Sequence, residues 1–140
     1  MQVFLDTNVV CDALFEREPW KEDALAILTL SRQQAITAIV SALTIANVFY
    51  IGRKLVGRER AASTVRTCLA TFVVLSLDRD AVAEACGRGG SDFEDDLQLT
   101  LALRSSADAI VTRDANGFRG SPLVIWTPAE FLSRLQTKKP

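Results

Sequence analysis

The sequence of 140 residues contains no histidine. This absence excludes Ser–His–Asp and Cys–His catalysis, histidine general bases, and nearly all zinc or iron sites that depend on an imidazole ligand. Any catalytic role therefore rests on carboxylate, lysine, tyrosine or thiol chemistry.

Long apolar runs are also missing, because no stretch approaches the roughly 20 residues that a membrane helix requires. The first six residues lack the basic start and the long apolar stretch of a secretory signal. We therefore expect a soluble cytoplasmic protein without membrane contact.

Cysteine is scarce, with three residues in the chain. Cys11, Cys68 and Cys86 are far apart, lack the paired spacing of a zinc site, and each lie in a mostly apolar stretch. We expect three buried thiols rather than a disulfide or a metal site.

Neither sign of charge is in excess, since 16 Lys and Arg residues face 17 Asp and Glu residues. The net charge of −1 neither attracts nor excludes nucleic acid, so that question depends on how the charges are distributed. A hydrophobic content of 49% with 24% charged residues is typical of a globular chain. The length and the few Gly and Pro residues favour one compact domain.

Apolar runs alternate with segments of helical periodicity along the chain. Strands are predicted at residues 3–5, 35–40, 72–75, 109–112 and 123–126. Helices are predicted at residues 7–15, 19–32, 42–57, 58–69, 80–86, 92–105 and 128–136, with a loop at 87–90. Apolar strands that alternate with helices predict an α/β fold: a single-domain three-layer α/β/α sandwich around a mainly parallel five-stranded sheet.

Acidic residues follow two of these strands and open one helix. Asp6 and Asp114 end strands at the carboxyl edge of the sheet, where ligands bind in open parallel sheets. Residues 92–96 place four acids at a helix start. Gathered carboxylates repel one another unless a cation offsets them, so the pattern favours Mg²⁺ or Mn²⁺.

Each acid also has a purely structural interpretation. Acids in the first turn of a helix are favoured by the helix dipole by roughly 0.3–1 kcal/mol each. Asp6 can act as a helix cap and Asp114 as a turn residue. The joint pattern favours the metal site over these separate interpretations. Asp12 and Asp80 are expected to lie outside it and to be neutral on substitution.

Four motifs, in this order, resemble the PIN-domain ribonucleases, and in particular their bacterial branch of VapC-type toxins. They are residues 5–9 (LDTNV), 41–46 (SALTIA), 92–95 (DFED), and 111–114 (VTRD) followed by Phe118. The resemblance spans nearly the full chain and implies a PIN-like domain over residues 1–136 with a frayed tail over 137–140.

The resemblance also implies roles for individual residues. Asp6, Asp95 and Asp114 match the catalytic, metal-binding carboxylates of the family, with Asp92 as an accessory metal-binding acid. Asn8 and Thr112 match polar residues that line its site.

One position departs from the family pattern. Asn47 stands where the family usually has a glutamate in its third helix. An amide oxygen can coordinate Mg²⁺ or orient a water, but it adds no negative charge and is not a base. Asp92 or Asp96 could supply the missing charge.

The resemblance therefore implies an Mg²⁺- or Mn²⁺-dependent endoribonuclease that hydrolyses RNA phosphodiester bonds. It further implies the toxin of a toxin–antitoxin pair, with a small antitoxin as partner and a homodimeric state. The alternative is a catalytically weakened PIN-like module that acts through partner contacts. A phosphotransferase of the haloacid dehalogenase type is disfavoured because its second acid would fall at Asn8.

Basic residues cluster between positions 51 and 70, where five of them face the single acid Glu59. Arg53, Lys54 and Arg58 are the candidate RNA contacts of this stretch, and a solvated helix face is the alternative. Aromatic residues make up only 7% of the chain, so recognition would depend on the RNA backbone and shape rather than on base stacking.

Overall fold

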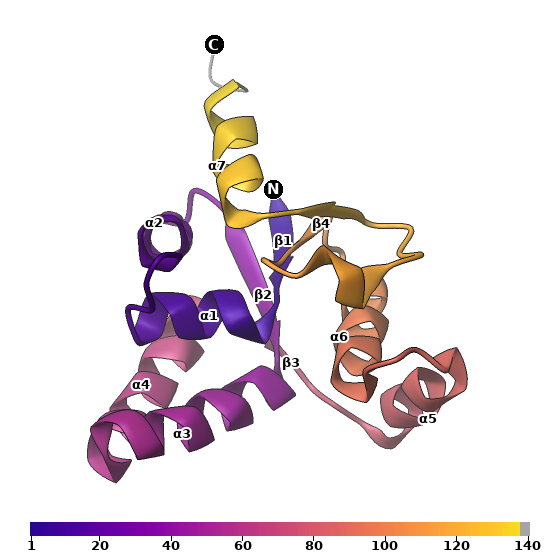
Figure 1. The fold of residues 1–140 in the computed structure, drawn as a ribbon, viewed down its shortest axis with the longest axis horizontal. Helices are drawn as coiled ribbons and strands as arrows, with labels where there is room; N and C mark the ends of the chain where they lie inside the picture. The colour runs from indigo at the N-terminus through magenta and orange to yellow at the C-terminus, as the bar shows by residue number, and fades with distance from the viewer. Residues whose placement is uncertain (138–140) are drawn as a thin grey trace.

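A five-stranded parallel sheet lies at the centre of the computed structural model, which describes residues 1–137 (Figure 1). The strands are β1 (Gln2–Leu5), β2 (Thr37–Ser41), β3 (Val73–Leu75), β4 (Ala109–Val111) and β5 (Val124–Trp126). Their order is β3-β2-β1-β4-β5, and every neighbouring pair is parallel. The α/β class and the five strands are confirmed, and the sheet is parallel throughout.

The central strand β1 is apolar on both of its faces. Val3, Phe4 and Leu5 are at most 2% exposed. Successive side chains of a strand point to opposite faces, so Val3 and Leu5 pack into one core cluster and Phe4 packs into the other. A strand of this kind is stable only when both faces of the sheet are covered.

Helices cover both faces, which confirms the three-layer sandwich. Figure 1 shows α1 to α4 on one side of the sheet and α5 and α6 on the other. The helices are α1 (Thr7–Leu14), α2 (Lys21–Arg32), α3 (Ala42–Val56), α4 (Arg58–Thr71), α5 (Arg79–Arg88), α6 (Phe93–Arg104) and α7 (Pro128–Thr137), with a 3-10 helix η1 (Ala115–Phe118). Within residues 1–137, none of the helices has both the length and the apolarity to cross a membrane.

The predicted helix starts are formed by hydrogen bonds of capping residues. The Ser41 hydroxyl accepts from the Thr44 backbone N–H at 3.0 Å at the start of α3. At the start of α7, the Thr127 N–H donates to Glu130 Oε2 at 2.8 Å and the Glu130 N–H donates to Thr127 Oγ1 at 3.3 Å. This reciprocal capping box satisfies two backbone donors that the helix itself leaves unpaired.

Several predicted boundaries were wrong. Helix α2 begins at Lys21, so Pro19 lies in the preceding turn rather than in the first helical position. Helix α5 extends two residues into the expected loop, to Arg88, while residues 89–90 lie outside it. Gly89 ends the helix with a φ of 66°, in the left-handed region that glycine adopts without strain. Helix α7 includes Thr137, and the rest of the expected frayed tail, 138–140, lies outside the described residues.

Two of the three cysteines are buried as predicted, and the third is not. Cys11 and Cys68 lie in the core, whereas Cys86 is exposed. Helix α5 buries only Ala81 and Ala85, and residue 86 is turned by about 100° from Ala85. The apolar neighbours of Cys86 in the sequence therefore mark the buried side of a surface helix and not the environment of the thiol.

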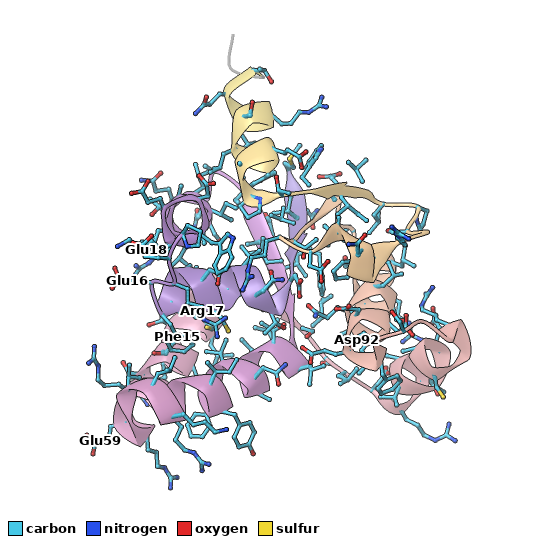
Figure 2. The ribbon with its side chains drawn as sticks, viewed as in Figure 1. Phe15, Glu16, Arg17, Glu18, Glu59 and Asp92 are labelled. Atoms are coloured by element: carbon cyan, nitrogen blue, oxygen red, sulfur yellow. The ribbon has the colours of Figure 1, made fainter. Side chains whose placement is uncertain are left out.

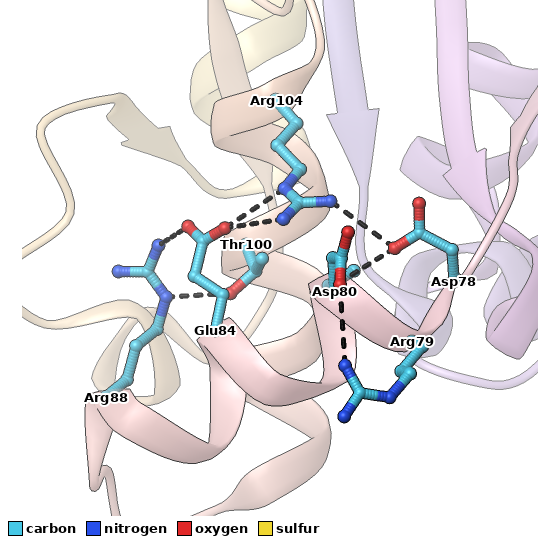
Figure 3. A network of polar contacts seen from close by, with 8 residues as sticks. Asp78, Arg79, Asp80, Glu84, Arg88, Thr100 and Arg104 are labelled. Carbon is cyan, nitrogen blue, oxygen red and sulfur yellow. Dashed lines mark hydrogen bonds and ion pairs between the residues drawn. The ribbon is translucent and has the colours of Figure 1, made fainter.

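A polar network fixes α5 against α6 (Figure 3). Arg104 Nη2 of α6 lies 2.8 Å from Glu84 Oε2 of α5, and Arg88 Nη2 lies 3.1 Å from Glu84 Oε1. Arg88 Nε also donates to Thr100 Oγ1 of α6 at 2.7 Å. Because α6 carries the acidic motif at its first turn, this network helps to hold that motif in place.

Substitution of Phe131 tests how α7 is attached to the sheet. Phe131 is fully buried and its ring stacks on Trp126 of β5 with centroids 6.1 Å apart. We expect Phe131→Ala to lower the free energy of unfolding by about 3–5 kcal/mol, because it leaves a large cavity in the core. Urea unfolding measures this change. Leu69→Ala, at a side chain that is 58% exposed, is the control and is expected to change stability by less than about 0.5 kcal/mol.

Candidate active site

The carboxyl ends of β1 and β4 and the first turn of α6 meet at one cavity of about 300 Å³. Five carboxylates belong to its lining. The lining residues are Asp6, Thr7, Asn8, Cys11, Arg17, Ile51, Asp92, Glu94, Asp95, Gln98 and Asp114. The structure thus brings together the four predicted metal-binding acids, which are up to 108 positions apart in the sequence.

Asp6 is the most deeply buried of these acids, with 5% of its surface exposed. Its Oδ2 accepts a hydrogen bond from Thr112 Oγ1 at 2.7 Å, and its Oδ1 accepts one from Gln98 Nε2 at 2.9 Å. Burial raises the pKa of Asp6, while these two hydrogen bonds act to lower it. The carboxylate is therefore held in a fixed orientation from both sides.

Asp95 experiences the field of the whole acidic group. Burial is the largest cause that raises its pKa, and the charges of Asp92, Asp6, Asp114 and Glu94 add to it, bringing the pKa to about 6. These neighbouring carboxylates disfavour the charged form of Asp95, and the five acids of the lining outnumber its one cation, Arg17. Such a group is a favourable position for a cation.

Asp92 and Asp114 also carry the structural roles that their sequence context suggested. Asp92 Oδ1 accepts from the backbone N–H groups of Glu94 at 2.9 Å and Asp95 at 3.2 Å, which makes it the cap of α6. Asp114 Oδ1 accepts from the Asn116 N–H at 3.2 Å and so shapes the turn into η1. Both residues nevertheless line the cavity, so the structural and functional interpretations are compatible.

Gly117 allows η1 to pack directly against Asp95. A Cβ atom at position 117 would overlap the Asp95 carboxylate. Only glycine permits this approach, which keeps the turn after Asp114 close to the first turn of α6. The sequence alone gave no sign of this contact, since Gly117 follows an ordinary turn residue.

Glu94 is a carboxylate of the cavity that the sequence analysis did not assign. Asn47 Nδ2 of α3 donates to Glu94 Oε1 at 2.8 Å. Burial, followed by the charges of Asp6 and Asp92, raises the pKa of Glu94. Asn47 itself is not among the cavity-lining residues. Its side-chain amide instead binds Glu94, an additional acid of α6 that does line the cavity.

Asp96 is not brought to the cavity. It is 9% exposed, and its Oδ2 accepts from the Gly90 backbone N–H at 2.9 Å. A Cβ atom at position 90 would overlap this carboxylate. Asp96 therefore holds the loop before α6, and Glu94 rather than Asp96 contributes a negative charge near Asn47.

The donor set suits a hard divalent cation. Carboxylate oxygens dominate the lining, and Asn8 Oδ1 is a buried oxygen that has no hydrogen-bond partner within residues 1–137. The Cys11 thiol is no competing soft ligand, because burial raises its pKa to about 11. Within residues 1–137, however, no three His, Cys, Asp or Glu side chains are already grouped closely enough to hold an ion together.

The predicted RNA contacts lie apart from this cavity. Arg53, Lys54 and Arg58 are exposed at the junction of α3 and α4, and none of them lines the cavity. The guanidinium of Arg53 lies 5.8 Å from the ring centre of Tyr50 on the same helix. The cation that does line the cavity is Arg17, which the sequence analysis did not single out.

Comparison with known proteins identifies the family. The model of the PIN domain family matches residues 2–116, and the chain belongs to this family. No curated protein sequence matches the chain significantly.

Solved structures share the fold at low sequence identity. The VapBC2 complex of Rickettsia felis, bound to a promoter DNA fragment, contains a chain 18% identical to this one with a TM-score of 0.67; the match covers 91% of this chain and 98% of that chain. A toxin–antitoxin complex of Klebsiella pneumoniae gives 21% identity, a TM-score of 0.66, and coverage of 90% and 97%. VapC20 of Mycobacterium tuberculosis, a toxin that cleaves the sarcin–ricin loop, gives 11% identity, a TM-score of 0.67, and coverage of 83% and 92%.

The raised pKa of Asp95 gives stability a definite pH dependence. Its folded-state pKa of about 6 lies above the ordinary aspartate value of 3.8, so the folded state binds this proton more tightly than the unfolded state. Above about pH 6, the ionised carboxylate of Asp95 therefore lowers the free energy of unfolding. This destabilisation is lost as the pH falls to about 4, where the carboxyl group of the folded protein is protonated. We expect Asp95→Asn to be more stable than the wild type at pH 7 by about 1 kcal/mol, allowing for solvent screening.

Urea unfolding without divalent ions at about pH 7 and about pH 4 measures the difference between the two proteins. The difference in free energy of unfolding between Asp95→Asn and the wild type is expected to be smaller at the lower pH. A stability difference that is the same at both pH values would contradict the raised pKa of Asp95, and with it the combined effect of burial and neighbouring carboxylates.

Proposed function

We propose that this protein is an Mg²⁺- or Mn²⁺-dependent endoribonuclease that hydrolyses RNA phosphodiester bonds. The observation that carries the proposal is the convergence of five carboxylates on one cavity at the carboxyl edge of the sheet. Membership of the PIN domain family supports it, since PIN homologues are nucleases and generally use divalent metal ions. VapC20, which shares the fold, is a toxin that cleaves the sarcin–ricin loop.

Asp6, Asp95 and Asp114 are the proposed catalytic ligands of the metal, with Asp92 as a further acidic ligand. When bound, a divalent ion lowers the pKa of a coordinated water and offsets the charge that develops on the phosphate. Thr112 and Gln98 orient Asp6 through its two oxygens. Asn8 offers a buried amide oxygen beside these acids.

Glu94 compensates for the asparagine at position 47 in this proposal. Asn47 Nδ2 orients Glu94 through the 2.8 Å hydrogen bond, so the charge that the third helix lacks is provided by α6. The alternative function is a catalytically weakened binding module that acts through partner contacts, and Asn47 is the observation that favours it. The additional carboxylate of Glu94 in the cavity favours the nuclease.

The proposed partners follow from the solved structures that share the fold. Several are toxin–antitoxin complexes, including those of Rickettsia felis and Klebsiella pneumoniae. We infer that this chain is the toxin of such a pair, with a small antitoxin protein as its partner, and that it forms a homodimer in the cytoplasm. Arg53, Lys54 and Arg58 are proposed to contact the RNA backbone beyond the cavity.

Removal of one carboxylate is expected to abolish cleavage without unfolding the protein. Asp6→Asn and Asp95→Asn each delete a charged ligand while preserving side-chain volume, so we expect metal-dependent RNA cleavage to fall by at least about 100-fold. Gel analysis of RNA incubated with Mn²⁺, with and without EDTA, measures this loss. Cleavage that is equal in all three proteins and insensitive to EDTA would contradict the nuclease assignment.

Asp80→Asn is the matched control for these variants, because the Asp80 side chain is 82% exposed and lies on α5. Asp12 is unsuitable for this purpose, contrary to the sequence-based expectation. It is 1% exposed and lies 2.9 Å from Arg113 Nε, so its substitution would remove the buried carboxylate that Arg113 and Arg17 face.

Metal binding is also testable without RNA. An ion that binds only the folded state stabilises it by about 2.7 kcal/mol at a hundredfold excess over Kd, which raises the melting temperature by several degrees. We expect this Mn²⁺ response in the wild type and in Asp80→Asn, and a smaller response in Asp95→Asn. Asn47→Glu should melt earlier without metal, because it places a carboxylate against Glu94, and should gain a larger response to Mn²⁺.

Thermal unfolding with increasing Mn²⁺ concentrations measures all four proteins in one series. An equal shift in the wild type and Asp95→Asn, or no shift in either, would mean that these acids serve only as caps and turn residues. The binding module would then replace the nuclease as the proposed function.

A further inference from the structure

Arg17 is the cation among the residues that line the acidic cavity. Five carboxylates share this lining with it. Figure 2 shows Arg17 beside α1 and Asp92 near the start of α6. The Arg17 side chain is 34% exposed and belongs to the lining of this cavity.

The turn after α1 is built to bring Arg17 to this position. The Arg17 backbone N–H donates to the carbonyl oxygen of Asp12 at 3.0 Å, which folds the chain back onto the helix. Glu16, directly before it, has a φ of 49°, in the left-handed region that residues other than glycine rarely adopt. Strained backbone of this kind is retained where the surrounding structure enforces it, and it is common at functional sites.

A buried carboxylate lies behind Arg17. Asp12 is 1% exposed, and its Oδ1 lies 3.8 Å from Arg17 Nη1. Its Oδ2 lies 2.9 Å from Nε of Arg113, whose guanidinium stacks on the Trp20 ring at 3.7 Å from the ring centre. Arg113 is thus the close partner of Asp12, whereas the contact with Arg17 is longer than a hydrogen bond and leaves Arg17 donors for another oxyanion.

The cavity presents a difficulty for an RNA substrate that Arg17 can resolve. A phosphodiester carries a negative charge and has to approach five carboxylates. A guanidinium at the edge of such a cavity can donate two parallel hydrogen bonds to the non-bridging oxygens of a phosphate. These bonds act where charge develops during hydrolysis.

We propose that Arg17 is a catalytic residue that binds the phosphodiester of the RNA substrate. This inference rests on the proposed nuclease function and adds to it the group of the protein that contacts the phosphate. It also assigns the acidic cavity its own phosphate-binding cation, separate from the exposed basic residues of α3 and α4.

The test compares Arg17→Gln and Arg17→Lys with Arg79→Gln, whose arginine is 93% exposed on α5. Cleavage of a fluorescent single-stranded RNA with Mn²⁺ gives kcat and KM, anisotropy at several salt concentrations gives affinity, and thermal unfolding gives the Mn²⁺ response. To prevent cleavage, the affinity is measured with each arginine variant combined with Asp95→Asn.

For Arg17→Gln we expect kcat/KM to fall by about 100-fold and the slope of log affinity against log salt to fall by about 0.7, as for one lost phosphate contact. The Mn²⁺-induced rise in melting temperature should be at least as large as in the wild type, since a repelling cation is removed. Arg17→Lys should regain the salt slope but only part of kcat, because an ammonium is not bidentate. Arg79→Gln should match the wild type in every measurement.

Wild-type cleavage and salt slope in Arg17→Gln, with a normal Mn²⁺ response, would overturn the role of Arg17 and leave the nuclease assignment intact. If Arg17→Lys reduces kcat and the slope of log affinity against log salt as much as Arg17→Gln does, Arg17 has a structural role. That result would also overturn phosphate binding by Arg17. Absence of both cleavage and Mn²⁺ response in the wild type would overturn the proposed function, and this inference with it.

Discussion

The burial of five carboxylates in one cavity, where they also repel one another, is the constraint on which the rest of this structure depends. Asp6 and Asp114 come from strands that neighbour each other in the sheet, and Asp95 comes from the helix before β4. Thr112 and Gln98 fix Asp6, and Gly117 packs against Asp95, so these acids are held in the lining of one cavity together with the single guanidinium of Arg17, although within residues 1–137 no three of them are already close enough to hold an ion.

The rest of the fold holds the segments that carry these acids in place. A parallel sheet buried on both faces places the ends of β1 and β4 at one edge, where neighbouring backbones are rigidly paired. The ion pairs and hydrogen bonds between α5 and α6 hold the acidic first turn of α6 from its far side (Figure 3). On the other side, Arg113 and Asp12 anchor the turn that carries Arg17.

The sequence predicted the architecture well because strands and caps are local signals. Apolar β-branched runs indicated the strands, and the residues around Ser41 and Thr127 indicated helix starts. Because Asp6 and Asp114 each follow a strand of a parallel sheet, the sequence also predicted that they lie at the same edge. Contacts between distant segments could not be predicted. A glutamine within a helix, such as Gln98, resembles a surface residue until the fold places it against Asp6, and the pairing of Asn47 with Glu94 joins positions 47 residues apart.

We propose above that the carboxylates of this cavity hold a divalent cation. Anomalous X-ray diffraction from crystals of the protein soaked in Mn²⁺ measures this directly, because it locates manganese independently of activity. We expect an anomalous peak among the side chains of Asp6, Asp95 and Asp114 that is absent from crystals of Asp95→Asn. A cavity without such a peak at saturating Mn²⁺, or manganese bound only at exposed acids elsewhere, would contradict it.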